Sequence, residues 1–486
     1  MKGGVEMKFD SIREFIEKIK ELGELKEVDH ADWNLEIGAI TELMAEKKGP
    51  ALLFNRIKDY SPGYRVLSNA FTTLKRTALV HGLPTELTAL DTLKAWRERI
   101  KDYQPVPPVE VKNGPVRENI LSGKDVDLFK FPTPKWHEHD GGRYIGTGCC
   151  IITRDPDDGW VNLGTYRAVV QDSQRLTIKI NLGKHGRIMM DKYHTRGESC
   201  PIAVTVGQDP VLFAAASDMA IPQGVSEYDF AGWMRGAPIE VVKGEVTDLP
   251  IPATAEIVIE GEIPPPPFEP LPEGPFGEWT GYTAEFTQGV HPTMTVKAIL
   301  HRNDPIILGV PPLKPPIPYD FAIPKKAAGV WDQIEKADIP GVKGVWFPSG
   351  FSSAAILAIA IEQQYPGHAK MAAVVGSACR AGTYGGRIVI VVDDDVDVSN
   401  IEELMWAVAT RCKAEEVDIV RGLWTAPTDP RMDPADRNQN LIVSSRIIIN
   451  ACRPWEMLKD FPPVNRFSPE YREQTLKKWP GVFTTA

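Results

Sequence analysis

Three strand patterns in close succession between residues 147 and 182 constrain the fold more than any other feature of the chain. Thr147–Arg154, Trp160–Gln171 and Leu176–Leu182 have the apolar, β-branched composition of strands. The segments between them, Asp155–Gly159 and Asp172–Arg175, are short and begin with Asp, which favours tight turns. Strands joined by such turns pair antiparallel with their neighbours. The sequence therefore predicts a three-stranded antiparallel meander.

Further strand patterns and two proline clusters follow in the middle third of the chain. The strand patterns, which we expect to extend the meander into a barrel-like sheet, are Ile202–Val206, Ile239–Lys243, Ala255–Glu262 and Met294–Leu300. The proline clusters are Pro264–Pro272 and Pro311–Pro318. Proline lacks a backbone donor and is excluded from helix interiors and inner strands, so both clusters are predicted to be ordered loops.

The first hundred residues mix helix and strand patterns. Apolar residues at Ile12, Phe15, Ile16, Ile19 and Leu22 lie on one helical face, with Asp10 or Ser11 as the cap and Gly23 as the stop. Other helices are expected at Leu35–Lys47 and Thr85–Lys101, and strands at Ala51–Phe54 and Tyr64–Leu67. The proline-rich segment Lys101–Asn113 then reads as a linker. This part is predicted to form an α/β domain.

The last third alternates between the two kinds of element. Strands are predicted at Gly344–Phe347, Ala369–Val375 and Arg387–Val392, and an apolar helix capped by the preceding serines at Ser353–Gln363. Ser399-Asn400-Ile401-Glu402 forms a capping box for a helix that runs to about Arg411. Alternation of strands and helices favours an α/β domain.

Composition excludes several classes of protein. The formal net charge is −10, so neither nucleic acid nor an anionic membrane surface is expected as a main partner. The six cysteines are scattered without a CxxC pair, which indicates reduced thiols rather than a zinc site or a redox pair. The amino terminus lacks the apolar core of a signal peptide, and no apolar run approaches the ~18–20 residues that cross a bilayer. These features predict a cytoplasmic protein without a membrane segment.

Six polar residues in the β-rich region are candidates for chemistry. They are Asn162 and Arg167, His185, Glu227, and the pair Glu273 and Glu278 in a Gly/Pro-framed loop. Asn oxygen, His nitrogen and Glu oxygen suit Mn²⁺ or Mg²⁺. Arginine with two carboxylates could hold a substrate carboxylate and supply a proton. Taken singly, each residue could equally be a hydrogen-bonded core group or a solvated turn residue.

In order and spacing, these residues resemble the UbiD-type decarboxylases, which use prenylated FMN. The match spans essentially the whole chain and rests on Asn162-(x4)-Arg167, His185, Glu227 and the motif Glu273-Gly-Pro-Phe-Gly-Glu278. The resemblance implies an amino-terminal α/β domain (residues 1–112), a central split β-barrel that binds the flavin (113–310), and a carboxy-terminal α/β oligomerisation domain (311–486).

The resemblance also assigns roles to single residues. Arg167 would orient the substrate carboxylate, Glu273 would hold Arg167, and Glu278 would protonate the carbon, so Glu278 is expected to be buried. Mn²⁺ would be bound by Asn162, His185 and Glu227, and K⁺ by Glu227 with the backbone near Trp160, Ala216, Ser217 and Met219. The flavin would contact Thr165, Tyr166, Arg167, Leu182 and Gly186, and also Arg387.

The implied function is reversible, non-oxidative decarboxylation of an aromatic, heteroaromatic or α,β-unsaturated acid. A flavin prenyltransferase would supply the cofactor, and the chain would form a homodimer or a homohexamer. Three alternatives stay open at this point: a carboxylase subunit of a larger complex, a reductase that uses ordinary FMN, and an inactive scaffold subunit. No GxGxxG nicotinamide fingerprint follows a predicted strand, which counts against the reductase.

Overall fold

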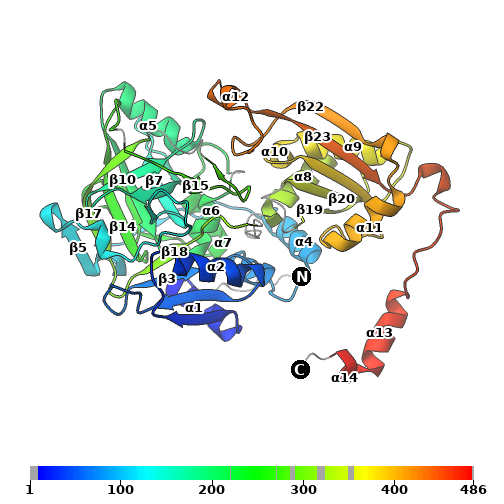
Figure 1. The fold of residues 1–486 in the computed structure, drawn as a ribbon, viewed down its shortest axis with the longest axis horizontal. Helices are drawn as coiled ribbons and strands as arrows, with labels where there is room; N and C mark the ends of the chain where they lie inside the picture. Colours follow the sequence, from blue (N-terminus) through cyan, green and yellow to red (C-terminus); the bar gives the residue numbers. More distant parts are fainter. Residues whose placement is uncertain are drawn as a thin grey trace.

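The protein consists of two lobes and a carboxy-terminal arm (Figure 1). The structure, a computed structural model, describes residues 9–218, 221–269, 271–284, 291–314, 323–348, 355–439 and 441–483. One lobe contains the sheets of the amino-terminal and middle thirds, and the other contains the sheet of the last third. Within the described ranges, no helix has the length and apolar character needed to cross a membrane.

The amino-terminal sheet has four strands in the order β1-β2-β3-β18. Their bounds are β1 Leu25–Asp29, β2 Ala51–Asn55, β3 Arg65–Ser68 and β18 Ile306–Gly309. The expected first helix is present as α1 (Ile12–Glu21), and the Ser11 side chain caps it by accepting from the Glu14 N–H. The fourth strand comes from the far end of the middle third and pairs parallel with β3. The middle third therefore returns to complete a sheet that begins near residue 25.

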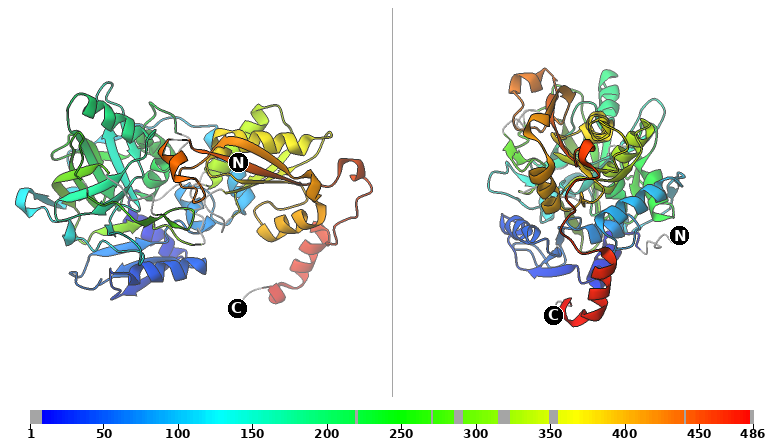
Figure 2. Two further views of the ribbon diagram at one scale, coloured as in Figure 1. Left: turned by 45° about the horizontal axis from the view of Figure 1, so that its top comes forward. Right: turned by 90° about the vertical axis from the view of Figure 1, so that its right-hand side faces the viewer.

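The central sheet has nine strands, with β5 attached beside β17 on a path that runs β6-β9-β10-β17-β14-β11-β7-β8. Their bounds are β5 Asn119–Ser122, β6 Arg143–Tyr144, β7 Cys149–Arg154, β8 Val161–Gly164, β9 Arg167–Val170, β10 Arg175–Lys179, β11 Cys200–Val206, β14 Ile257–Ile263 and β17 Thr293–His301. The sheet curls into a half-barrel that packs on the amino-terminal sheet (Figures 1 and 2).

The predicted three-stranded meander is wrong in one respect. Trp160–Gln171 is not one strand: it breaks after Gly164, so that β8 pairs with β7 while β9 pairs with β10. In the strand order β8 is the last strand at one end and β9 the second strand from the other end, so the two residues between them connect opposite sides of the sheet path. Strand composition alone does not reveal such a crossing, because both halves are apolar and buried.

The segment around Ile239–Lys243 does not extend the barrel-like sheet as predicted. Its strand, β12 (Glu240–Lys243), pairs instead with β13 (Pro250–Pro252) and, in parallel, with β4 (Val109–Glu110). β4 lies within the predicted linker, so that linker docks against the middle third through backbone hydrogen bonds. Where the structure describes the two proline clusters, they are loops outside helices and strands, as expected.

The last third forms a five-stranded sheet in the order β19-β20-β21-β23-β22. Its strands are β19 Val342–Trp346, β20 Ile356–Ile361, β21 Ile388–Asp393, β22 Asp418–Trp424 and β23 Val443–Ala451. Two predictions in this region are wrong. The apolar segment predicted as a helix at Ser353–Gln363 is β20, and the strand predicted at Ala369–Val375 is the helix α9 (His368–Ala378).

A physical reason explains both errors. Every residue of β20 is buried, and a strand buried on both faces shows no alternation of apolar and polar residues. Small residues such as Ala372, Ala373 and Gly376 let α9 lie close against the sheet. Periodicity cannot distinguish a buried strand from a buried helix of this length. The serines expected to cap this segment lie outside the described residues.

The remaining helices cover these sheets. Their bounds are α2 Glu36–Glu46, α3 Leu74–Val80, α4 Ala89–Ile100, α5 His185–Thr195, α6 Pro210–Ala216, α7 Glu227–Arg235, α8 Ile323–Lys336, α10 Arg380–Thr383, α11 Ile401–Arg411, α12 Pro434–Asn438, α13 Pro469–Lys478 and α14 Pro480–Phe483. The predicted helix near Ser399 is α11, although its cap is Asn400. An Arg97–Asp332 ion pair joins α4 to α8 across the two lobes.

Candidate active site

Arg167, Glu273 and Glu278 meet in one buried cluster. Arg167 Nε and Nη2 donate to the two carboxylate oxygens of Glu273 at 2.5 and 2.8 Å, and Nη1 donates to Glu278 Oε1 at 3.0 Å. The Glu273 side chain has no exposed surface, and those of Arg167 and Glu278 are 12% and 8% exposed. The expected burial of Glu278 is therefore confirmed. The bidentate hydrogen bond to Glu273 fixes the plane of the Arg167 guanidinium and leaves its Nη1 edge facing Glu278.

Two elements bring this cluster together. Arg167 is the first residue of β9, and the carboxylates flank β15 (Phe276–Gly277), which pairs with β16 (Thr283–Ala284). Gly141 donates its N–H to the Pro275 carbonyl at 2.8 Å, which ties the loop to the segment before β6. A Cβ at Gly141 would lie 2.2 Å from the Gly274 oxygen, so only glycine fits this approach.

Electrostatics keep Arg167 charged. Burial lowers its pKa, but the hydrogen-bonded Glu273 and the charge of Glu278 outweigh that effect and raise it. The guanidinium also lies 5.2 Å from the centre of the Phe276 ring, a favourable cation–π distance.

Lys179 is a fourth member of the cluster that sequence reasoning missed. Its Nζ lies 3.6 Å from Glu278 Oε1, and burial lowers its pKa. The sequence contained a signal for it: the buried Ile178 and Ile180 flank Lys179 at the end of a strand, so Lys179 points to the opposite face. Without knowledge of the strand pairing, that face could not be assigned to the site.

Asn162 and Glu227 come together beside β8. Both are buried, and Leu163 donates its N–H to Glu227 Oε2 at 2.7 Å. Burial raises the pKa of Glu227 to about 7. Among the described residues, Nδ2 of Asn162 has no hydrogen-bond partner. The side-chain oxygen of Asn162 and the carboxylate of Glu227 are the oxygen ligands that a hard cation prefers.

His185 reaches the same region from the start of α5. Its ring lies 5.0 Å from that of Trp160, the residue before β8. Burial lowers the pKa of His185, and the charges of Lys184 and Arg380 lower it further, which favours the neutral imidazole that binds metals. The next residue, Gly186, donates its N–H to the Tyr166 hydroxyl at 3.3 Å.

The other predicted cofactor and metal residues are distributed as follows. Thr165 is exposed in the crossing between β8 and β9, and Leu182 is 70% exposed on the loop before His185. Ala216 ends α6, and Ser217 Oγ donates to the Ala214 carbonyl at 2.8 Å. Met219 lies outside the described residues. Within the described part of the chain, no group of three or more His, Cys, Asp or Glu side chains could hold a metal ion. The predicted metal ligands contain only two residues of these types, His185 and Glu227, because the third, Asn162, is an amide.

Arg387 forms an ion pair with Asp429 in the carboxy-terminal lobe. In the part of the chain that the structure describes, neither this ion pair nor its backbone hydrogen bonds involve the six candidate residues. The predicted contact of Arg387 with the cofactor stays a prediction.

A cavity of about 400 Å³ opens next to Glu278 on the side of the amino-terminal domain. Lys314 lines it together with α2 residues and the segment around His137. His291 lies behind the cluster, with Nε2 3.8 Å from Glu273 Oε2.

Three family models match this chain in sequence order. They describe the amino-terminal, Rift-related and carboxy-terminal domains of 3-octaprenyl-4-hydroxybenzoate carboxy-lyase (UbiD), over residues 16–96, 108–315 and 322–451. The chain belongs to the UbiD family. Membership makes it a carboxy-lyase, which confirms the class of enzyme that the motifs predicted.

Relatives of known activity cover nearly all of the chain. It is 32% identical over 461 residues to a pyrrole-2-carboxylic acid decarboxylase of Pseudomonas aeruginosa, and the match covers 91% of each chain. Among solved structures, UbiD-class HmfF of Pelotomaculum thermopropionicum in complex with FMN has a TM-score of 0.83 at 30% identity, covering 96% of this chain and 100% of the other.

Two further solved structures extend the comparison. An evolved dimeric form of HmfF in complex with prFMN has a TM-score of 0.78 at 28% identity, covering 95% and 100% of the two chains. Vanillic acid decarboxylase of Sedimentibacter hydroxybenzoicus in its open form has a TM-score of 0.81 at 29% identity, covering 97% and 99%. The chain thus shares its multidomain fold with these enzymes.

Proposed function

We propose that this UbiD-family enzyme reversibly decarboxylates an aromatic, heteroaromatic or α,β-unsaturated carboxylic acid with prenylated FMN as cofactor. The buried Arg167–Glu273–Glu278 cluster carries this proposal. A guanidinium held rigidly on one side can orient a substrate carboxylate on the other, and a buried carboxylic acid next to it can deliver a proton to carbon. Pyrrole-2-carboxylate is the first substrate to test, because the curated relative acts on it.

When bound, prenylated FMN would supply the electron sink that decarboxylation at an sp² carbon requires. Relatives of similar fold bind FMN and prFMN, which supports this cofactor. Tyr166 and the apolar, exposed Leu182 are available to line the ring system. Thr165, Gly186 and Arg387 complete the proposed contacts.

We assign Mn²⁺ to Asn162, His185 and Glu227, and K⁺ to Glu227 with the backbone near Trp160, Ala216, Ser217 and Met219. The neutral imidazole and the buried, electrically uncompensated carboxylate described above support this assignment. In an acidic protein, such ions would neutralise the charge of a flavin phosphate.

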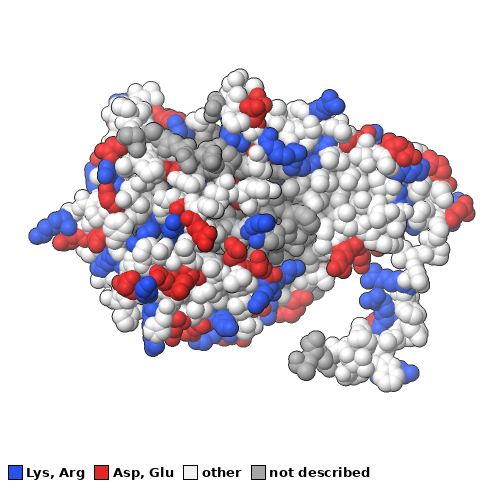
Figure 3. Space-filling model, viewed as in Figure 1, with Lys and Arg blue, Asp and Glu red and all other residues white. Residues whose placement is uncertain are grey.

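The proposed partners are the small carboxylic acid, a flavin prenyltransferase that supplies the cofactor, and further copies of the chain in a homodimer or homohexamer. We keep the cytoplasm as the proposed location. Acidic and basic side chains are interspersed over the described part of the face in Figure 3, without an extended basic surface for nucleic acid. The domain boundaries at residues 112 and 310 remain predictions, and β18 contributes to the amino-terminal sheet from within the central range.

The test is CO₂ release from pyrrole-2-carboxylate, furan and benzoic acids and cinnamate by protein made together with a prenyltransferase. Glu278→Gln keeps the shape but cannot donate the proton, so turnover should fall at least about 100-fold while flavin absorbance is unchanged. Unchanged CO₂ release from this variant would remove Glu278 from its role. Activity of wild type with FMN alone would instead favour the reductase.

A further inference from the structure

Lys179 is placed beside the reacting groups by the pairing of β9 with β10. In that register Lys179 lies directly opposite Arg167, so both side chains project from the same face of the sheet. Nζ is 3.6 Å from Glu278 Oε1, and the Lys179 side chain is only 14% exposed. No hydrogen bond from Nζ to another described residue is within normal length. A buried ammonium that has three donors and a single long ion pair is poorly satisfied.

The charges around Lys179 come from several elements. Arg167 on β9 lowers its pKa in addition to burial, whereas Glu278 and Glu273 on the facing loop raise it. Glu278 also lies within electrostatic range of Tyr384 and Arg437 from the other lobe. Tyr144 and His291 lie beside Glu273 rather than beside Lys179.

The cluster contains one more cation than it can pair when Glu278 is protonated. Arg167 is then neutralised by its two bonds to Glu273, and no other described residue provides Lys179 with a counter-charge. An anion brought next to Glu278 would supply that counter-charge, and a substrate carboxylate is such an anion.

We propose that Lys179 is the counter-cation of the one negative charge that moves during the reaction. This inference rests on the proposed function above. In the ground state, Lys179 supplies the counter-charge of the substrate carboxylate that Arg167 orients. The C–C bond to that carboxylate then breaks and CO₂ leaves, the electron pair stays with the substrate, and the Glu278 acid proton forms the new C–H bond. The negative charge now resides on Glu278, next to the same ammonium.

Charge and atoms balance without a further reactant. Before the reaction the group consists of the substrate carboxylate, the Glu278 carboxylic acid and the Lys179 ammonium. After it, the group consists of the new C–H bond of the product, CO₂, the Glu278 carboxylate and the same ammonium. The net charge of the group is zero before and after, so no isolated charge is created in a buried site. Glu278 regains its proton from water, which the cavity beside it admits.

The first test measures binding without chemistry. Cyclopentanecarboxylate resembles a five-membered substrate but has no unsaturated bond, and cyclopentanecarboxamide is its uncharged match. In titration calorimetry of the holoenzyme, Lys179→Met should weaken carboxylate binding roughly tenfold to a hundredfold and leave the carboxamide unchanged. Lys179→Arg should retain most of the affinity. Arg175→Met is the control, because Arg175 is on the same strand but pairs with Asp172 outside the site.

The second test measures kcat and KM for CO₂ release from the best acid in the screen. Lys179→Met should raise KM, because the substrate carboxylate loses its counter-cation, and lower kcat, because the Glu278 carboxylate that forms is no longer stabilised. Lys179→Arg keeps the positive charge and should restore both values. If Lys179 only filled space, Lys179→Met and Lys179→Arg would change the two values alike.

The outcomes separate this inference from the proposed function. If Lys179→Met behaves like Arg175→Met in both tests while Glu278→Gln is inactive, Lys179 is structural and the decarboxylase assignment stands. If Glu278→Gln retains turnover, the proposed function fails first. Equal loss of carboxylate and carboxamide binding in Lys179→Met would also overturn the inference, because it would show damage to the pocket.

Discussion

At the scale of single residues, the site is a buried set of charges that nearly cancel. Glu273 is fully buried and is matched by the bidentate Arg167, which is the geometry that makes a buried ion pair tolerable. Glu227 has no such partner within the described chain, and burial raises its pKa to about 7. This difference in charge compensation supports the two ligands proposed above: a cation at Glu227 and an anion at Lys179.

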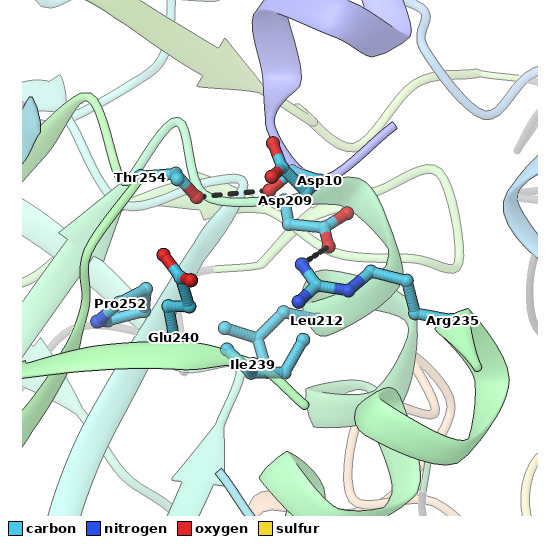
Figure 4. A pocket seen from close by; sticks show the side chains of 8 residues that line it. All are labelled: Asp10, Asp209, Leu212, Arg235, Ile239, Glu240, Pro252 and Thr254. Carbon is cyan, nitrogen blue, oxygen red and sulfur yellow. Dashed lines mark hydrogen bonds and ion pairs between the residues drawn. The ribbon is translucent and has the colours of Figure 1, made fainter. Parts of the chain in front are cut away.

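Asp209 is a buried carboxylate at the start of α6 (Figure 4). Its Oδ1 caps α6 by accepting from the Val211 N–H at 2.8 Å, while Oδ2 has no hydrogen bond to a described residue and lies 3.6 Å from Arg235. Burial raises the pKa of Asp209 from 3.8 to about 6. A raised pKa means that the folded state binds this proton more tightly than the unfolded state.

Stability should therefore respond to pH through Asp209. Above pH 6 the charge of Asp209 lowers the free energy of unfolding by up to about 3 kcal/mol. This destabilisation disappears as the pH falls towards 4. Asp209→Asn still caps the helix but carries no charge. In urea unfolding, the variant should exceed wild type in stability at pH 8, keep about half of that advantage at pH 5 and lose it towards pH 4. A difference that does not vary with pH would contradict this account.

At the scale of elements, the crossing from β8 to β9 decides the shape of the site. Tyr166 folds back over Gly164, where a Cβ would lie 2.3 Å from the tyrosine ring. The hydroxyl of the same tyrosine accepts the N–H of Gly186, the residue after His185. One glycine thus lets Asn162, Arg167 and His185 approach a common region from three different elements.

Gly164→Ala should displace the Tyr166 ring, because the ring has no room beside a methyl group in a packed interior. We expect a loss of stability of about 1–3 kcal/mol and weaker flavin retention. Thermal unfolding and the flavin absorbance of purified protein measure both effects. Tyr166→Ala removes the clash, so adding Gly164→Ala to it should cost little more. Additive losses would place the damage elsewhere.

At the scale of the whole molecule, the carboxy-terminal arm stands apart. Figures 1 and 2 show it leaving the second lobe, with α13 projecting beyond the body. Neither α13 nor α14 has a buried residue, and Phe467, Trp479 and Val482 are 71%, 54% and 70% exposed. Isolated helices shorter than about 12–15 residues are marginal in water. The proposed homo-oligomer offers a surface against which these side chains can pack.

Removal of residues 460–486 should therefore weaken assembly. We expect a smaller mass in light scattering, or a dissociation midpoint at least about tenfold higher in protein concentration, because several apolar side chains lose their contacts. Replacing Phe467, Leu476 and Trp479 by Ser in the full chain is the matched variant and should act in the same direction. An unchanged mass in both would show that assembly uses other surfaces.

Much of this architecture follows from local pattern. The apolar stripe of α1 and its Ser11 cap require only a 3.6-residue period and a hydroxyl, and the structure confirms both. The six candidate site residues were identified from their types, order and family spacing. The chemical groups of these six residues are given by their amino-acid types, so the sequence is enough to identify them.

Tertiary structure alone decided the rest. Periodicity could not separate β20 from a helix, because a segment buried on both faces has no polar side to reveal its period. It could not show the break after Gly164 or the place of Lys179, since both depend on which strands become neighbours. The sequence by itself determined the family, the local elements and the chemical groups. Long-range pairing determined which of those groups share a buried site, because contact between distant residues is a property of the packed chain.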